Sequence, residues 1–217
     1  MIVSDSFAQR ERHLLCDLLD QVGPDAATLC EGWDCYALVS HLWVRETDPL
    51  ALPGVAVSAL SALTEKRMRR CRQRHTYTDL VELVRRGPAR YSPFSLPGVD
   101  AQANSLEYFV HHEDVRRAVD PTAGPRALAS PDSGLLWARL PAMGALLLRD
   151  GRDKAGIGVI VEHRDADGLR QHRLRPGTPI VTITGQPGEI WLWLYGRRPV
   201  ARVELTGTAQ ALAAFTA

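Results

Sequence analysis

Hydrophobic positions in the first two thirds of the chain recur with the period of an α-helix. The segments that carry this pattern are separated by short stretches rich in Gly, Pro and Asp, which end helices. Asp34 and either Thr76 or Thr78 suit helix N-caps, and Gly87 suits a helix end. The pattern predicts helices over residues 5–21, 34–48, 61–74, 76–87, 100–119 and 132–149.

Beyond residue 155 the helical period gives way to runs of β-branched residues bounded by turn residues, which is typical of strands. The stretch 169–177 alternates in character and is expected to pair with the strand before it. Pro187 near a first turn and Gly196 at an end delimit a helix between two strands. Strands are predicted over residues 156–163, 169–177, 178–185 and 200–207, with helices over 187–196 and 208–215.

This order of elements predicts an α+β protein with two domains. A helical bundle is expected at residues 1–152, followed by a small α/β domain at residues 153–217. A chain of 217 residues is long enough for either domain to bury a sizeable core.

Charge and composition narrow the set of functions. The formal net charge is +1 and the basic residues are spread along the chain, whereas nucleic-acid-binding proteins usually concentrate them in a patch. No apolar run approaches the ~18 residues needed to span a membrane, and the N-terminus lacks the apolar core of a signal peptide. We therefore expect a cytoplasmic protein with no nucleic-acid or membrane partner, whose four cysteines are reduced thiols without a functional role.

The predicted helix over residues 100–119 contains the sequence NSLEYFVHHEDVRRAV, with several acidic and histidine side chains among apolar ones. Glu107 and His111 stand one turn apart on one face, and Asp114 falls within about 60° of both. His112 points away from that face. A carboxylate and an imidazole at this spacing can grip one metal ion. The spacing also suits a solvated face or a hydrogen-bonded polar cluster.

His41, in the predicted helix over residues 34–48, offers a third ligand because it lies on a face that should be buried. A histidine there can also be a hydrogen-bonded core residue. Burying Glu107 unpaired would be costly, and a cation removes that cost. His41, Glu107 and His111 form a His₂Glu set, and three protein ligands with one open position are typical of catalytic zinc sites.

Two segments that carry these residues resemble a known family. TLCEGWDCYALVSHL and EYFVHHEDVRR are similar to the metal-binding segments of DinB-like proteins. The fuller resemblance is to the mycothiol-dependent maleylpyruvate isomerase group of actinobacteria, and VTITGQPGEIWLWLYGRRPVARVELTGTAQALAAF resembles the C-terminal domain of that group. The resemblance implies an up-down-down-up four-helix bundle followed by a sterol-carrier-like α/β domain.

The resemblance also implies a site and a chemistry. His41, Glu107 and His111 match the ligands of a divalent ion, often zinc, and mycothiol is the implied cosubstrate. Arg197, in YGRRP, matches an arginine that reaches the active site and could clamp a substrate carboxylate. Arg197 and Arg198 could instead cap the preceding helix.

The function expected from this set is a metal-dependent transferase or isomerase that acts on a small electrophile with a metal-bound thiolate. The alternatives are a non-catalytic metal-containing protein that binds a ligand, and a hydrolase that uses zinc-bound water. The protein is expected to be a monomer or a homodimer.

One expectation concerns how the site is held. We expect the helices of His41 and His111 to be parallel neighbours in the bundle. Arg45 and Asp114, one turn beyond the ligands on the same face, should then form an ion pair that orients the ligands.

Overall fold

The structure is a computed structural model, and it describes residues 5–48, 61–89, 92–96, 98–148, 156–166 and 168–216. It is a mixed α+β fold that divides into two compact units, Met1–Ala123 and Gly124–Ala217. Among the described residues, no helix combines the length and apolar character needed to cross a membrane.

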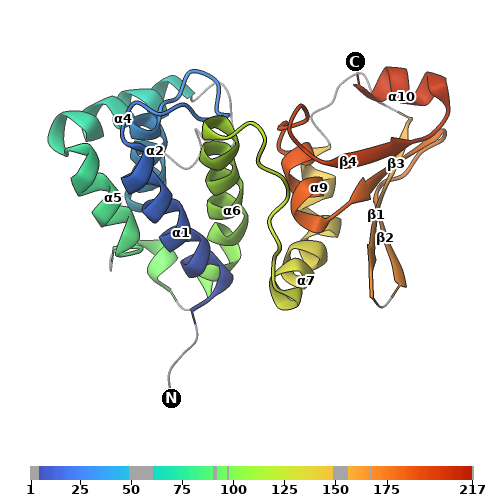
Figure 1. The fold of residues 1–217 in the computed structure, drawn as a ribbon, viewed down its shortest axis with the longest axis horizontal. Coiled ribbons are helices and arrows are strands. Elements are labelled where there is room, and N and C mark those ends of the chain that lie inside the picture. Colours follow the sequence, from blue (N-terminus) through green and yellow to red (C-terminus); the bar gives the residue numbers. More distant parts are fainter. Residues whose placement is uncertain are drawn as a thin grey trace. The chain divides into compact units, whose positions relative to one another are not determined.

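The first unit is helical, and its helices begin and end close to the predicted positions (Figure 1). Asp34 caps α2, because its side chain accepts a hydrogen bond from the Ala37 amide. Thr76 caps α5 in a capping box with Asp79. The helices are α1 (Phe7–Val22), α2 (Cys35–Thr47), α4 (Ser61–Arg74), α5 (Tyr77–Arg85) and α6 (Val99–Val119), with a 3₁₀ turn at Pro93–Ser95.

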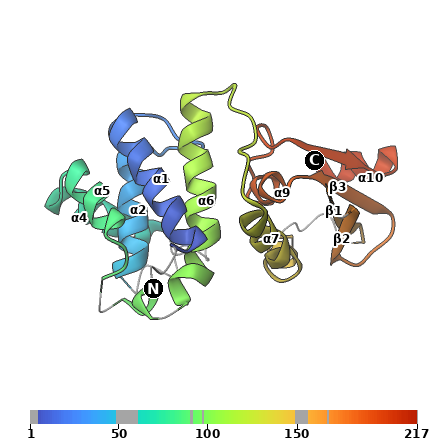
Figure 2. The same ribbon diagram turned by 60° about the horizontal axis from the view of Figure 1, so that its bottom comes forward.

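Contacts between α1 and α6 show that these two helices run in the same direction (Figures 1 and 2). Phe7 lies against Phe109, and Glu11, one turn later, contacts His112. α5 runs against α1: the Tyr77 hydroxyl donates to Leu19 O, and Val81 O lies near Cys16.

α2 runs against α6, which contradicts the expected parallel arrangement. Cys30, just before α2, contacts Asp114, whereas Arg45, near the end of α2, contacts Asn104. The expected up-down-down-up order itself gives the second and fourth helices opposite directions, so the expected parallel pair did not follow from it. The helix that runs parallel to α6 is α1. The predicted Arg45–Asp114 pair is therefore wrong, because the two residues lie on opposite sides of the ligands.

The second unit contains a four-stranded sheet in the order β2-β1-β3-β4. β1 pairs with β2 in an antiparallel hairpin, as predicted, and with β3 in parallel; β3 and β4 are antiparallel. The strands are β1 (Gly158–Asp165), β2 (Gly168–Arg175), β3 (Ile180–Gly185) and β4 (Val203–Thr206). The helices of this unit are α7 (Ser130–Arg139), α8 (Ala145–Leu147), α9 (Pro187–Leu194) and α10 (Ala209–Thr216).

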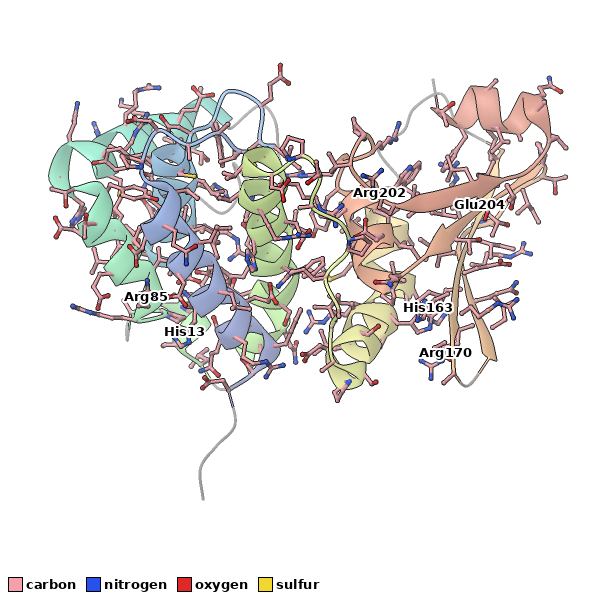
Figure 3. All side chains as sticks on the ribbon, in the orientation of Figure 1. His13, Arg85, His163, Arg170, Arg202 and Glu204 are labelled. Carbon is pink, nitrogen blue, oxygen red and sulfur yellow. The ribbon has the colours of Figure 1, made fainter. Side chains whose placement is uncertain are left out.

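Two tryptophans anchor helices in the core of the second unit. Trp191 of α9 is fully buried, and its indole N–H donates to Leu136 O of α7. Trp137 of α7 stacks on His172 of β2. The ring of His163 of β1, which Figure 3 labels, also lies near Trp137. α7 therefore belongs with the sheet.

The single helix predicted over residues 132–149 is observed in pieces. α7 passes into one π turn at Leu140–Gly144 and then into α8. Pro141 explains the irregularity, because proline cannot donate an amide hydrogen bond within a helix.

The predicted domain boundary at residues 152 and 153 lies outside the described residues. The compact units instead divide between Ala123 and Gly124. α7 packs on α9, so it is grouped with the second unit.

Candidate metal centre

The three predicted metal ligands meet inside the first unit. His41 Nε2 lies 3.1 Å from Glu107 Oε1, and His111 Nε2 lies 3.4 Å from the same oxygen. One ligand atom from each residue falls within 4.8 Å of the other two. The structure therefore brings together the three residues that the sequence predicted to share one site, His41 from α2 and Glu107 and His111 from α6.

The local sequence explains how α6 presents these groups. Glu107 and His111 are one turn apart, so their side chains lie one above the other on the face toward α2. His112 turns away from this face, as predicted, and its Nδ1 lies 3.2 Å from Glu11 Oε2 on α1. His41 and His111 are 5% and 9% exposed, respectively, so the ligand groups are largely shielded from water.

His111 lies between two carboxylates. Its Nδ1 is 2.9 Å from Asp114 Oδ2, and its Nε2 faces Glu107. Since Asp114 is fully buried and its carboxylate accepts a hydrogen bond there, it favours the tautomer with hydrogen on Nδ1. Nε2 then directs either a second proton or a lone pair at the Glu107 oxygen. A lone pair facing a carboxylate is repulsive, so this position requires a positive charge.

The pKa shifts of these groups agree with that requirement. Burial alone would lower the pKa of His111, but hydrogen bonds with Asp114, Cys30 and Glu107 raise it well above its usual value. Burial raises the pKa of Glu107, yet Arg45 and the two histidines bring it well below its usual value. Glu107 is therefore a carboxylate, and a proton on His111 supplies positive charge in the metal-free protein.

Burial lowers the pKa of His41, and this effect outweighs its hydrogen bond with Glu107. His41 is thus a neutral imidazole, the form that binds metals. Its buried Nδ1 has no hydrogen-bond partner within the described part of the chain.

A divalent cation fits this donor set. Two imidazole nitrogens and one carboxylate oxygen converge on one point, and these are ligand types of catalytic zinc. A bound ion would supply the positive charge that the proton on His111 otherwise provides. Asp114 would hold the other nitrogen of His111, as carboxylates commonly do behind metal-binding histidines.

Arg45 acts on Glu107 rather than on Asp114. Its Nε lies 3.3 Å from Glu107 Oε1, and its guanidinium also donates to Asn104 Oδ1 and Ala103 O. The guanidinium lies over the Phe94 ring, 5.0 Å from its centroid. Arg45 therefore fixes the position of the carboxylate ligand.

Cys30 lies at this site, which the sequence interpretation missed. Its Sγ donates to Asp114 Oδ2 at 3.2 Å and lies 3.7 Å from His111 Nδ1. The neighbouring Trp33 places its ring 4.9 Å from the His41 ring centroid. The available signal was the position of both residues in the turn just before α2, where a chain running against α6 approaches Asp114.

Arg197, the other predicted site residue, belongs to the second unit. Its Nη1 donates to Tyr195 O at 2.6 Å, at the end of α9. This contact matches the alternative that Arg197 caps a helix C-terminus. Arg197 and the three predicted metal ligands thus belong to different compact units.

Comparisons with known proteins give one structural likeness. The chain is similar to the crystal structure of the mycothiol-dependent maleylpyruvate isomerase, at 14% sequence identity and a TM-score of 0.46, over 92% of this chain and 90% of that chain. The matching structure thus comes from the group that the sequence segments resemble. No family model and no curated protein matches the chain.

Proposed function

We propose that the first unit binds a divalent metal ion, zinc for preference, through His41, Glu107 and His111. The observation that carries the proposal is the convergence of their three ligand atoms, with Asp114 holding the far nitrogen of His111. The donor set leaves room for one further ligand, which is typical of catalytic zinc.

We further propose that the protein is a thiol-using transferase or isomerase that acts on a small electrophile. The sequence segments that resemble the mycothiol-dependent isomerase group suggest mycothiol as cosubstrate. A zinc ion, when bound, favours the thiolate form of a coordinated thiol. The resemblance to a thiol-dependent group assigns the attacking sulfur to the cosubstrate, whereas Cys30 Sγ lies on the Nδ1 side of His111 and donates to Asp114.

The chain's own residues have defined roles in this proposal. Glu107 is kept as a carboxylate by Arg45, and His41 is kept neutral by burial. Asp114 fixes the ring of His111, so its Nε2 points to the site. On the basis of the resemblance, Arg197 is proposed to bind a carboxylate group of the substrate.

The finer fold assignment is also a proposal. Relative to α1, α2 and α5 run in the opposite direction and α6 runs in the same direction. This order supports an up-down-down-up bundle of the DinB-like type, with α4 in the connection between α2 and α5. The sheet with α9 and α10 is proposed to be the sterol-carrier-like domain.

Metal content of the purified protein tests the site. We expect about one zinc ion per chain in the wild type and after His112→Ala, because His112 contacts Glu11 instead. His41→Ala and His111→Ala should contain none. Full occupancy in these two variants would reject the ligand assignment.

Cobalt substitution tests the use of a thiol. Adding mycothiol to the cobalt protein should produce a thiolate-to-cobalt charge-transfer band, because the sulfur binds the ion directly. An unchanged spectrum at saturating mycothiol would reject this part of the proposal. Turnover of esters or amides without thiol would favour the hydrolase alternative.

A further inference from the structure

His111 is flanked by a second group of metal-ligating atoms on the side away from His41. Its Nε2 faces Glu107, beyond which lies His41. Its Nδ1 faces Asp114, beyond which lies Cys30. Each nitrogen of one imidazole thus points to a carboxylate that is backed by another metal-binding side chain.

The distances on the Cys30 side suit a single metal ion. Cys30 Sγ lies 3.2 Å from Asp114 Oδ2 and 3.7 Å from His111 Nδ1, and the nitrogen and oxygen are 2.9 Å apart. Zinc–ligand bonds of about 2.0–2.3 Å at tetrahedral angles place ligand atoms roughly 3.3–3.7 Å apart. Movements of a few tenths of an ångström would admit an ion.

The turn that carries Cys30 is held in place. The Cys30 amide donates to Thr28 Oγ1 at 3.1 Å, and the Thr28 hydroxyl donates to Trp33 O at 2.8 Å. The Leu29 amide donates to Asp114 O at 3.1 Å, which ties the turn directly to α6. The sulfur is therefore positioned by backbone and side-chain contacts before any ion binds.

We propose that Cys30, Asp114 and Nδ1 of His111 form a second metal position, which binds a soft thiophilic cation such as Cd²⁺ in preference to zinc. A thiolate ligand favours such ions over harder ones. Among the four cysteines, Cys16, Cys35 and Cys71 are buried, whereas Cys30 is half-buried and within reach of an ion from solvent.

Proton balance makes this position an alternative to the His41 position. When an ion binds, the Cys30 thiol releases its proton to solvent. The His111 imidazolium releases its Nδ1 proton to solvent as well. It keeps the proton on Nε2, which donates a hydrogen bond toward Glu107 Oε1, 3.4 Å away. Neutral His111 offers one lone pair, so it can serve one ion at a time. The inference goes beyond the proposed function, since it requires neither His41 nor a thiol cosubstrate.

Cadmium alone is the probe, added to the full chain after metal removal and in a thiol-free reductant. We expect an ultraviolet thiolate-to-cadmium charge-transfer band in the wild type, with one ion bound per chain. His41→Ala, which removes the first position, should keep the band. Cys30→Ser should lose it, and the matched control Cys35→Ser should keep it, because Cys35 is buried away from His111.

A band that survives Cys30→Ser, or that is lost with Cys35→Ser, would overturn the assignment. Two cadmium ions per chain in the wild type would show that the two metal positions do not compete for His111.

Alkylation of the unmutated protein tests the site without relying on a variant that has to fold. Cadmium should slow the labelling of Cys30 at least tenfold, as measured by peptide mass spectrometry, and unchanged labelling would reject the site. The two proposals can fail separately in His41→Ala. Its zinc content tests the metal site of the proposed function, and its cadmium band tests the Cys30 position.

Discussion

Helix α6 carries two buried polar clusters, one on each side of Arg45, and they are organised in opposite ways. In the first, every charge faces an opposite charge or a hydrogen-bond donor; we call it the closed cluster. In the second, ligand atoms of like character converge on one point; we call it the convergent cluster. The closed cluster consists of Arg12, Glu46, Asp100, Asn104 and Tyr108, and the convergent cluster of His41, Glu107, His111, Asp114 and Cys30.

Arg12 lies at the centre of the closed cluster. Its guanidinium binds both oxygens of Glu46, at 2.9 and 2.8 Å, and also Asp100 at 2.7 Å. It donates to Tyr108, whose hydroxyl donates in turn to Glu46. Asn104 bridges the two acids. A cluster whose groups satisfy one another has a structural role.

The convergent cluster differs because three side chains that can bind one metal ion meet in it. Glu107 Oε1 lies near both histidines and near Arg45. In the metal-free protein, a proton on His111 supplies a further positive charge. The comparison teaches that burial of charge is common to both clusters, whereas convergence of ligand atoms distinguishes the proposed metal site.

Breaking the closed cluster should have the largest effect on stability. Arg12→Ala leaves the Glu46 carboxylate buried and unpaired, and we expect the free energy of unfolding to fall by about 3–5 kcal/mol. Urea denaturation followed by circular dichroism measures this change. Zinc content of the folded fraction should stay near that of the wild type, and a loss of zinc would show that the two clusters are not independent.

Weakening the convergent cluster should change metal affinity instead. Asp114→Asn keeps the shape of the side chain but removes the charge that holds His111 Nδ1. We expect zinc affinity to fall about 10–100-fold, which is about 1.4–2.7 kcal/mol. Competition with a chromophoric chelator measures it. An affinity equal to that of the wild type would contradict the role of Asp114.

The pH dependence of the metal-free protein should report the proton on His111. Because the folded pKa of His111 is raised, its stabilisation is complete below the unfolded value of 6.5 and is lost as pH rises toward the folded value. We expect the free energy of unfolding to fall above that pH by at most about 1.4 kcal/mol per pH unit. His111→Gln should flatten this slope, and an equal slope in that variant would exclude His111 as its source. The lowered pKa of Glu107 changes the free energy of unfolding only at acidic pH, where the carboxylate becomes protonated.

The smallest effect is expected from an exposed counterpart of the closed cluster. Arg85 of α5 also pairs with two acids, Asp17 and Asp20 on α1, but the side chains of both acids are more than half exposed (Figure 3). Arg85→Ala should cost about 0–1 kcal/mol, and less at high salt. The same urea experiment compares it with Arg12→Ala. If Arg85→Ala lowered the free energy of unfolding as much as Arg12→Ala does, burial would not explain the difference between the two arginine clusters.

The sequence by itself determined the elements and the faces of α6. Helical period, the caps at Asp34 and Thr76, and the β-branched runs after residue 155 predicted nearly every helix and strand, because these signals act over a few residues. The spacing of Glu107 and His111 determined that they share a face, and that His112 does not.

Tertiary structure alone decided what those faces meet. Helix direction depends on which apolar surfaces pack together across the whole unit, and no local pattern encodes it. The antiparallel course of α2 against α6 therefore placed Arg45 at Glu107 and brought Cys30 to Asp114, where the sequence had suggested an Arg45–Asp114 pair. For the same reason, the contacts of Trp191 with Leu136 and of Trp137 with His172 assigned α7 to the second unit.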